Sequence, residues 1–218
     1  MASIIFVLFV TVGVPIFACV YAIYKRRFMP FILGVLAFVI SQILIRIPLL
    51  EYLAAKSSTY LMWSVEYPVF FVIFLAFTAG IFEESARWIA MSVFMKQRDR
   101  LSGVVFGIGH GGIEAFSIVG LAVIATMNIS NAYWISGIER LIAICIHIGL
   151  SLIVLAAVKD RRLSYLLVAI CLHGVINSIA GILSTSGAAI AVIETVLLIL
   201  AILTLFIAST LLRKGEGK

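Results

Sequence analysis

The sequence predicts an all-α bundle of about seven membrane-spanning helices. The chain has 218 residues, 64% of them hydrophobic, and its mean hydropathy is +1.23, whereas soluble domains are nearer ~45–50% apolar. Its apolar runs are continuous and about twice as long as the ~10-residue alternating segments of a membrane β-barrel. Because no polar stretch is long enough for a separate soluble domain, we expect residues 1–218 to form a single integral membrane domain.

Seven apolar runs are long enough to cross a ~30 Å hydrocarbon core as helices. Short polar segments separate them, and residues 54–66 are polar enough to predict an external loop. The expected spans cover approximately residues 3–24, 30–53, 69–95, 101–127, 134–158, 163–183 and 188–212.

The basic residues gather between these spans in four short clusters. The clusters lie at residues 25–27, 96–100, 159–162 and 213–218. If the chain crosses the membrane seven times, all four basic clusters lie on the same side of the membrane. The positive-inside rule then predicts an external N-terminus and a cytoplasmic C-terminus. Clusters bracketed by membrane-length runs indicate a multi-pass protein of a cell membrane, in contact with lipid, and not a nucleic-acid-binding protein.

Two adjacent carboxylates and an arginine lie in the middle of the third run, at Glu83, Glu84 and Arg87. A charged side chain at a helix centre costs at least ~2.5–3.5 kcal/mol on insertion scales, so these groups need partners. Arg87 lies four residues after Glu83 and three after Glu84, which lets it reach either carboxylate. We expect Arg87 to be their structural counter-charge.

Polar residues on other spans share the depth of this stretch. At ~1.5 Å per residue, four groups on four helices lie about 15–18 Å from the nearest basic cluster: Glu84, His110, His147 and His173. Each histidine has a polar residue one turn later: Glu114, Ser151 and Asn177, respectively. Such stripes face the interior of a bundle. Arg46, Glu139 and Arg140 are expected nearer the outer interface, pairing or snorkelling there.

The fourth span also carries a glycine stripe, at Gly103, Gly107 and Gly111. Small residues at this spacing let helix backbones approach closely. We therefore expect His110 to lie in a tightly packed wall.

This group of residues suits hydrolysis inside the membrane. A glutamate with a neighbouring histidine can activate water as a general base, and His173 and Asn177 can donate to an oxyanion. The substrate would be a peptide bond in a membrane-embedded or membrane-anchored segment. Two alternatives stay open: a zinc ion held by His110, His147, His173 and Glu84, and proton-coupled transport.

Three motifs carry a resemblance to a known family. Glu83-Glu84-x-x-Arg87, Phe106-x-x-x-His110 and His173-x-x-x-Asn177, in this order, resemble the CAAX-protease and bacteriocin-processing superfamily of intramembrane proteases. The segment Phe106-Gly-Ile-Gly-His110-Gly-Gly-Ile-Glu114-Ala is similar to its YhfC branch, and the spacing of Arg87 resembles its PrsW branch.

The resemblance covers about residues 79–178 and implies a catalytic core at about residues 69–183. It implies a glutamic-type mechanism in which Glu83, Glu84 and His110 activate water and His173 and Asn177 support the oxyanion. The supporting residues are Arg87, Glu114 and His147. No cofactor is favoured and zinc stays open, because the family has also been called metalloprotease. His147 also resembles a histidine of the related γ-secretase scaffold subunit, so a non-catalytic scaffold or immunity protein is a further alternative.

Overall fold

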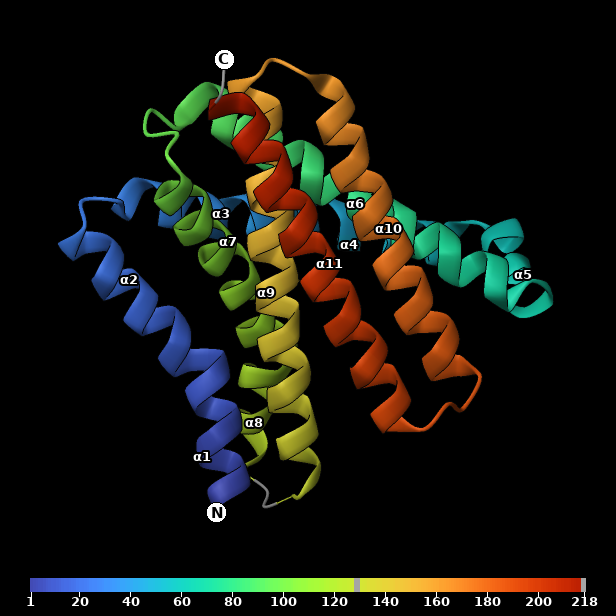
Figure 1. Cartoon of the computed structure of the whole chain (residues 1–218). Coiled ribbons are helices and arrows are strands. Elements are labelled where there is room, and N and C mark those ends of the chain that lie inside the picture. The colour runs from blue at the N-terminus through green and yellow to red at the C-terminus, as the bar shows by residue number, and fades with distance from the viewer. Residues whose placement is uncertain (128–129, 217–218) are drawn as a thin grey trace.

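The structure is a computed structural model that describes residues 1–127 and 130–216. Residues 128–129, in the loop expected after the fourth span, and residues 217–218, in the basic tail, lie outside the described part. Within the described residues, seven helical stretches are long and apolar enough to cross a membrane: Ala2–Tyr24, Phe28–Lys56, Pro68–Phe94, Arg100–Thr126, Ala132–Lys159, Leu163–Thr185 and Ile190–Arg213. The predicted all-α, seven-span architecture is confirmed (Figure 1).

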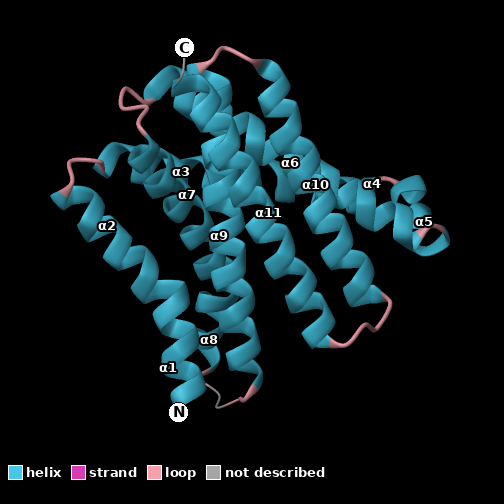
Figure 2. Cartoon of the chain, viewed as in Figure 1, coloured by secondary structure: helices cyan, strands magenta, loops and turns pink. Residues whose placement is uncertain are grey.

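Short connections join the helices (Figure 2). The helices are α1 (Ala2–Leu8), α2 (Val14–Tyr24), α3 (Phe28–Phe38), α4 (Ile47–Lys56), α5 (Ser58–Glu66), α6 (Pro68–Ile89), α7 (Arg100–Ala115), α8 (Leu121–Thr126), α9 (Ala132–Lys159), α10 (Leu163–Thr185) and α11 (Ile190–Glu216). Four spans also contain a π-helical segment: Phe9–Gly13, Val39–Arg46, Ala90–Phe94 and Phe116–Gly120. Such segments are frequent at functional sites, and the second of them carries two polar side chains of the cavity described below, Gln42 and Arg46.

The external loop predicted at residues 54–66 is mostly helical, so that prediction was wrong. The second span continues to Lys56, and α5 begins directly after Ser57. Ser57 has an extended backbone, and its hydroxyl accepts a hydrogen bond from the backbone N–H of Tyr60 at 3.2 Å, which caps the new helix. The Tyr60 ring packs against Phe71 of α6, with ring centroids 5.0 Å apart. The polar composition of the segment reflects a surface helix and not an absence of structure.

Helix α9 is the central helix of the bundle. Its apolar window is 72% buried, against 17–39% for the other spans. It packs against α7, α10 and α11, and Figure 1 shows it between α7 and α11. Leu150, Ile153 and Leu155 on α9 are fully buried in the main apolar core. A polar residue on α9 therefore faces other helices, which explains why His147 needs partners within the protein.

Helix α7 is clamped between α3 and α9. A Cβ added to Gly107 would lie 2.5 Å from the Cα of Ile148 on α9, which is closer than real Cβ contacts. A Cβ on Gly109 would run into the backbone oxygen of Phe31 on α3. This is the close backbone approach that the small residues predict. It fixes the position of α7, the helix that carries His110, between its two neighbours.

The two ends of the bundle differ in the segments they carry. Figure 1 shows the C-terminus and the connection between α9 and α10 at one end. The N-terminus and the connection between α10 and α11 lie at the other end. Which end faces the cytoplasm stays a prediction from the placement of the basic residues.

Candidate active site

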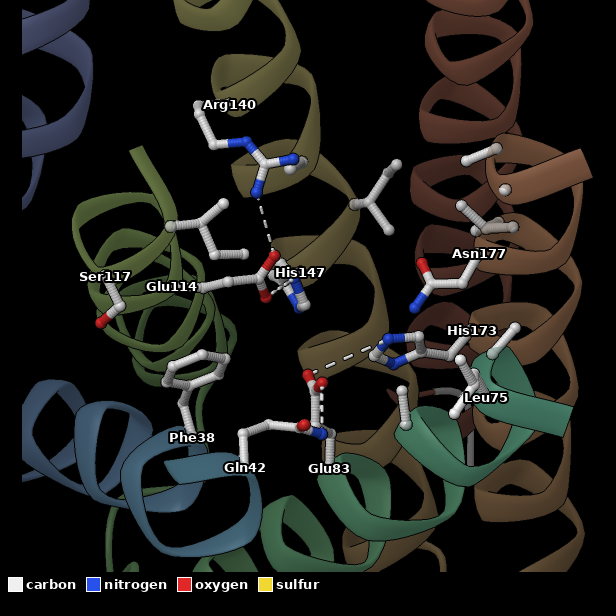
Figure 3. A pocket seen from close by; sticks show the side chains of 18 of the residues that line it. Phe38, Gln42, Leu75, Glu83, Glu114, Ser117, Arg140, His147, His173 and Asn177 are labelled. Carbon is white, nitrogen blue, oxygen red and sulfur yellow. Dashed lines mark hydrogen bonds and ion pairs between the residues drawn. The ribbon is translucent and has the colours of Figure 1, made fainter. Parts of the chain in front are cut away.

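A cavity of about 630 Å³ opens among the helices of the bundle. Its walls are largely apolar, and its polar lining comes from several spans. The polar lining residues are Gln42, Arg46, Glu83, Glu114, Ser117, Glu139, Arg140, His147, His173 and Asn177. Figure 3 shows Glu83, Glu114, His147, His173 and Asn177 around the same space, carried by different helices. A polar, roomy cavity inside a membrane bundle can hold water and part of a substrate.

Glu83 on α6 lies where three other helical segments meet. Its Oε1 accepts a hydrogen bond from the Gln42 amide at 2.8 Å. Its Oε2 lies 2.9 Å from Nε2 of His110 on α7 and 3.9 Å from Nε2 of His173 on α10. Helix α6 can approach α10 this closely because Gly80, almost one turn earlier, leaves room for the backbone oxygen of Ile170. Glu83 is thus the carboxylate of the adjacent pair that faces the cavity.

Glu84 faces away from the cavity, because neighbouring residues on a helix point in directions about 100° apart. It is fully buried, with one carboxylate oxygen 3.5 Å from Nε of Arg87 and the other 2.7 Å from Nδ1 of His173. Arg87 is therefore the counter-charge of Glu84, which is one of the two partners that the spacing allowed. Glu84 orients a cavity residue without lining the cavity itself.

Arg87 ties α6 to α9. Its Nη1 donates to the backbone oxygen of His147 and to Oγ of Ser151, both at 3.1 Å. Its Nη2 lies 3.2 Å from Nδ1 of His147. All of these groups are buried. An arginine with this many contacts holds the histidine ring in one position.

A second chain of polar contacts runs from His147 through Glu114 to Arg140. Nε2 of His147 lies 2.7 Å from Oε2 of Glu114, and Nη1 of Arg140 donates to the other oxygen of Glu114 at 3.3 Å. Nη2 of Arg140 donates to Glu139 at 2.6 Å. The expected pairing of Glu139 with Arg140 is present. Arg140 also lines the cavity, and its depth in the membrane stays a prediction.

Two further residues of the second span, Gln42 and Arg46, line the cavity and were not predicted from the sequence to belong to the site. Nη1 of Arg46 donates to Oε1 of Gln42 at 2.9 Å, and its Nε donates to Thr78 at 3.2 Å. Gln42 in turn donates to Glu83, so the two residues form a chain that orients the carboxylate. The sequence did contain a sign of their role, because Gln42 and Arg46 are one helical turn apart. At ~1.5 Å per residue, Gln42 lies about 22 Å along the helix from the basic cluster that ends at Arg27.

The three histidines lie together. The ring centroids of His110 and His147 are 5.0 Å apart, and those of His147 and His173 are 5.7 Å apart. Asn177, one turn after His173, lines the same cavity and is half-buried. The residues that share a depth in the sequence therefore also share one site.

Four of these side chains can hold a metal ion. Ligand atoms of Glu83, His110, Glu114 and His147 all lie within 4.8 Å of one another. Imidazole nitrogens and carboxylate oxygens are the usual partners of zinc in catalytic sites, so the donor set fits a divalent cation. It differs from the zinc set expected from sequence, since Glu84 is turned toward Arg87 and His173 while Glu83 and Glu114 face the cavity.

Comparison with known proteins gives two findings. A family model described as YhfC intramembrane metalloprotease matches residues 8–133 and 123–199. The chain is also 34% identical over 148 residues to the uncharacterized membrane protein YhfC of Bacillus subtilis (strain 168), an alignment that covers 52% of this chain. The chain spans 57% of the length of that relative.

Proposed function

We propose that this chain, which belongs to the YhfC intramembrane metalloprotease family, is a metal-dependent endopeptidase that hydrolyses peptide bonds in membrane-embedded or membrane-anchored substrates. The observation that carries the proposal is the cluster of Glu83, His110, Glu114 and His147, three of which line the cavity among the spans: Glu83, Glu114 and His147. Two carboxylates and two imidazoles at one point in an apolar bundle are expensive. A hydrolytic function would explain why the protein keeps these two carboxylates and two imidazoles despite their cost.

The proposed metal would be held by side chains of this cluster, with Glu83 and His110 as the central pair because their ligand atoms are 2.9 Å apart. Bound there, a zinc ion would polarise the peptide carbonyl and lower the pKa of a water molecule. A cavity carboxylate that is not a ligand takes the proton of the attacking water and passes it to the nitrogen of the leaving amine. The peptide bond is then replaced by a carboxylate and an amine.

We propose that Asn177 binds the carbonyl oxygen of the substrate. Its amide lines the cavity and can donate a hydrogen bond to the oxyanion. His173, the other donor expected from sequence, has its Nδ1 against Glu84 at 2.7 Å. As a neutral imidazole it carries its proton on that side and presents a lone pair to the cavity. His173 therefore has no proton to offer an oxyanion in that state.

The catalytic unit proposed here is longer than residues 69–183. Gln42 and Arg46 contribute to the cavity from the second span, and Gln42 contacts Glu83 directly. We therefore place the start of the unit near residue 39, within one membrane domain of residues 1–218. The substrate is a peptide or a membrane protein.

A glutamic-type mechanism is the second candidate. The observation in its favour is the direct 2.9 Å contact between Glu83 and His110, which is the geometry of a carboxylate and an imidazole that share the activation of one water molecule. In this candidate Glu83 takes a proton from the attacking water and passes it to the nitrogen of the leaving amine, while the contact with His110 holds the carboxyl group in place. Both candidates need the same two residues, and they differ in their dependence on a metal.

The test uses the full chain purified into lipid nanodiscs, with a fluorogenic single-span peptide as substrate. We expect cleavage by the wild type, loss of cleavage in Glu83→Gln and His110→Gln, and loss on treatment with a zinc chelator that is reversed by added Zn²⁺. Ser117→Ala is the matched control, since Ser117 lines the same cavity but its hydroxyl donates to the backbone oxygen of Ile113 in its own helix.

Three results contradict the proposal. Full activity of protein shown to be metal-free by elemental analysis points to the glutamic-type mechanism. Unchanged activity of Glu83→Gln and His110→Gln removes both mechanisms. A biological function retained by both variants, without any cleavage, points to the scaffold alternative.

A further inference from the structure

A long groove lies between the second and third spans, and we call it the α3–α6 groove. It encloses about 560 Å³ and shares no lining residue with the cavity of the candidate active site. Its floor consists of small, buried side chains: Ala37 and Ser41 on the second span and Ala90 on the third. Ile40 and Ile89 stand exposed at its rim. The hollow therefore exists because both helices place small residues where they face each other.

The lining of the α3–α6 groove suits a hydrocarbon chain. Among the described residues, Ser41 and Ser85 are the polar ones in this lining, and the Ser41 hydroxyl donates to the backbone oxygen of Ala37 in its own helix at 2.6 Å. The lining of the second span runs from Leu33 to Ile45, which is about 18 Å at ~1.5 Å per residue. This length is close to one leaflet, which is half of a ~30 Å hydrocarbon core.

One end of the α3–α6 groove continues into a basic pocket. This pocket encloses about 440 Å³, and its lining includes Arg26 and Lys96. Phe94 lines both hollows. On α3 the lining continues in the same way, from Leu33 in the groove to Met29, one turn earlier, in the basic pocket. The two hollows thus form one path from an apolar groove to a positively charged end.

The positive charges of this pocket are available to a ligand. The ion pair between Arg27 and Asp99, at 2.9 Å, ties the two basic loops together. Arg98 donates to two backbone oxygens at the end of the third span. By contrast, Arg26 and Lys96 are exposed, and neither forms an ion pair within the part of the chain that the structure describes. Two cations without a counter-ion at the end of an apolar groove favour a ligand that is anionic at one end and apolar along the rest.

We propose that the α3–α6 groove binds an anionic glycerophospholipid, with an acyl chain in the groove and the phosphate between Arg26 and Lys96. Arginine and lysine bind phosphate oxygens through charge-assisted hydrogen bonds. Basic pockets between membrane helices on the cytoplasmic side bind anionic head groups, and the predicted orientation places both basic loops on that side. The site is separate from the cavity, so the proposal does not depend on the proposed function.

The test measures lipid binding to the full chain, purified in detergent and freed of lipid. Native mass spectrometry follows titrations with phosphatidylglycerol and with phosphatidylcholine of the same acyl chains. We expect one tightly bound phosphatidylglycerol per chain, weaker binding of phosphatidylcholine, and a higher unfolding temperature with phosphatidylglycerol, because a ligand of the folded state stabilises it. Glycerol 3-phosphate, which has the anionic group without the acyl chains, should not displace the lipid.

Two double variants with the same change of charge test the basic pocket. Arg26→Gln/Lys96→Gln should weaken phosphatidylglycerol binding by about 25-fold, since each basic residue near an anionic head group contributes about 5-fold. Lys159→Gln/Arg161→Gln removes two exposed charges from another basic loop, and neither residue lines the groove or the basic pocket. This control should bind as the wild type does. Equal weakening in both double variants, or in neither, overturns the proposal.

Two phenylalanine substitutions test the apolar part. Ser85→Phe fills the α3–α6 groove and should abolish tight binding of phosphatidylglycerol. Thr195→Phe is the control, because Thr195 is exposed on α11 and does not line the groove. Tight binding retained by Ser85→Phe, or displacement of the lipid by glycerol 3-phosphate, overturns the proposal.

Two further outcomes are decisive. Equal affinity of the wild type for the two lipids rules out a site for an anionic head group. A wild type that binds no phosphatidylglycerol but is dimeric by mass, and a monomeric Ser85→Phe, would show that a second copy covers the groove. If Ser85→Phe does not fold, as judged by thermal unfolding, the two double variants keep the proposal testable, because their four residues are exposed.

Discussion

The amide of Gln42 donates a 2.8 Å hydrogen bond to Oε1 of Glu83, across 41 positions of the chain. The contact leaves only Oε2 of Glu83 to face His110 and His173. Arg46 fixes the orientation of the amide by donating to its oxygen at 2.9 Å. One carboxylate oxygen is therefore bound by the second span, and the other is the one that the proposed function would use.

The first prediction concerns this contact. Gln42→Ala should lower kcat by about 10–100-fold, the usual effect of losing a hydrogen-bond partner behind a functional group, with little change in KM. Steady-state cleavage of a single-span peptide in nanodiscs gives both constants. Thr78→Val is the matched control, since Thr78 contacts Arg46 but not Glu83. A kcat of Gln42→Ala equal to that of the wild type would show that Glu83 needs no such support.

The second prediction concerns the packing of α7 on α9. Gly107→Ala should destabilise the protein by about 1–3 kcal/mol, the usual effect of overpacking, because the new Cβ would lie 2.5 Å from the backbone of Ile148. Thermal unfolding in detergent measures the change. The control is Gly13→Ala, where the nearest atoms belong to the Phe9 side chain, at 3.1 Å, and can move. Equal stability of both variants would contradict a tight α7–α9 contact.

The third prediction concerns pH and Asp99, which lies outside the spans. Burial raises the pKa of Asp99, but hydrogen bonds from Ser102 and the ion pair with Arg27 outweigh burial and lower that pKa below its usual value of 3.8. A lowered pKa in the folded state gives stability that is present above the unfolded pKa and is lost as the pH falls through the folded value. We expect the thermal stability that depends on Asp99 to disappear below about pH 4.

Asp99→Asn and Asp99→Ala separate the two roles of this residue. Asparagine still caps α7 but does not titrate, so Asp99→Asn should lose only the pH-dependent part. Asp99→Ala should lose a further 0.5–2 kcal/mol or so, because the N-cap of α7 disappears as well. Unfolding temperatures at pH 7 and at about pH 3 provide the comparison. Identical pH profiles for the wild type and Asp99→Asn would rule out a contribution from the ion pair.

The fourth prediction is the orientation in the membrane. The basic clusters predict that the segment around Ser57 lies outside and that Arg161 lies in the cytoplasm. In a chain whose three native cysteines are replaced, Ser57→Cys should react with a membrane-impermeant maleimide on intact cells. Arg161→Cys should react only after the cells are permeabilised, and the opposite pattern would invert the topology.

The order of residues along the chain was enough to predict the seven spans and the polar side of each helix that cannot face lipid. Span length and hydropathy are local properties, and the cost of exposing a charge to lipid forces Glu83, Arg87 and His110 inward whatever their partners are. The family followed from the same motifs, because they are short and ordered along the chain.

Which of these groups meet depends on the packing of the helices. It places Glu83 in the cavity, turns Glu84 toward Arg87 and brings in Gln42. The decisive contacts join residues 27, 41, 60 and 89 positions apart. They depend on how each helix is rotated about its axis and how closely glycines let the backbones approach, and neither is a local property of the sequence.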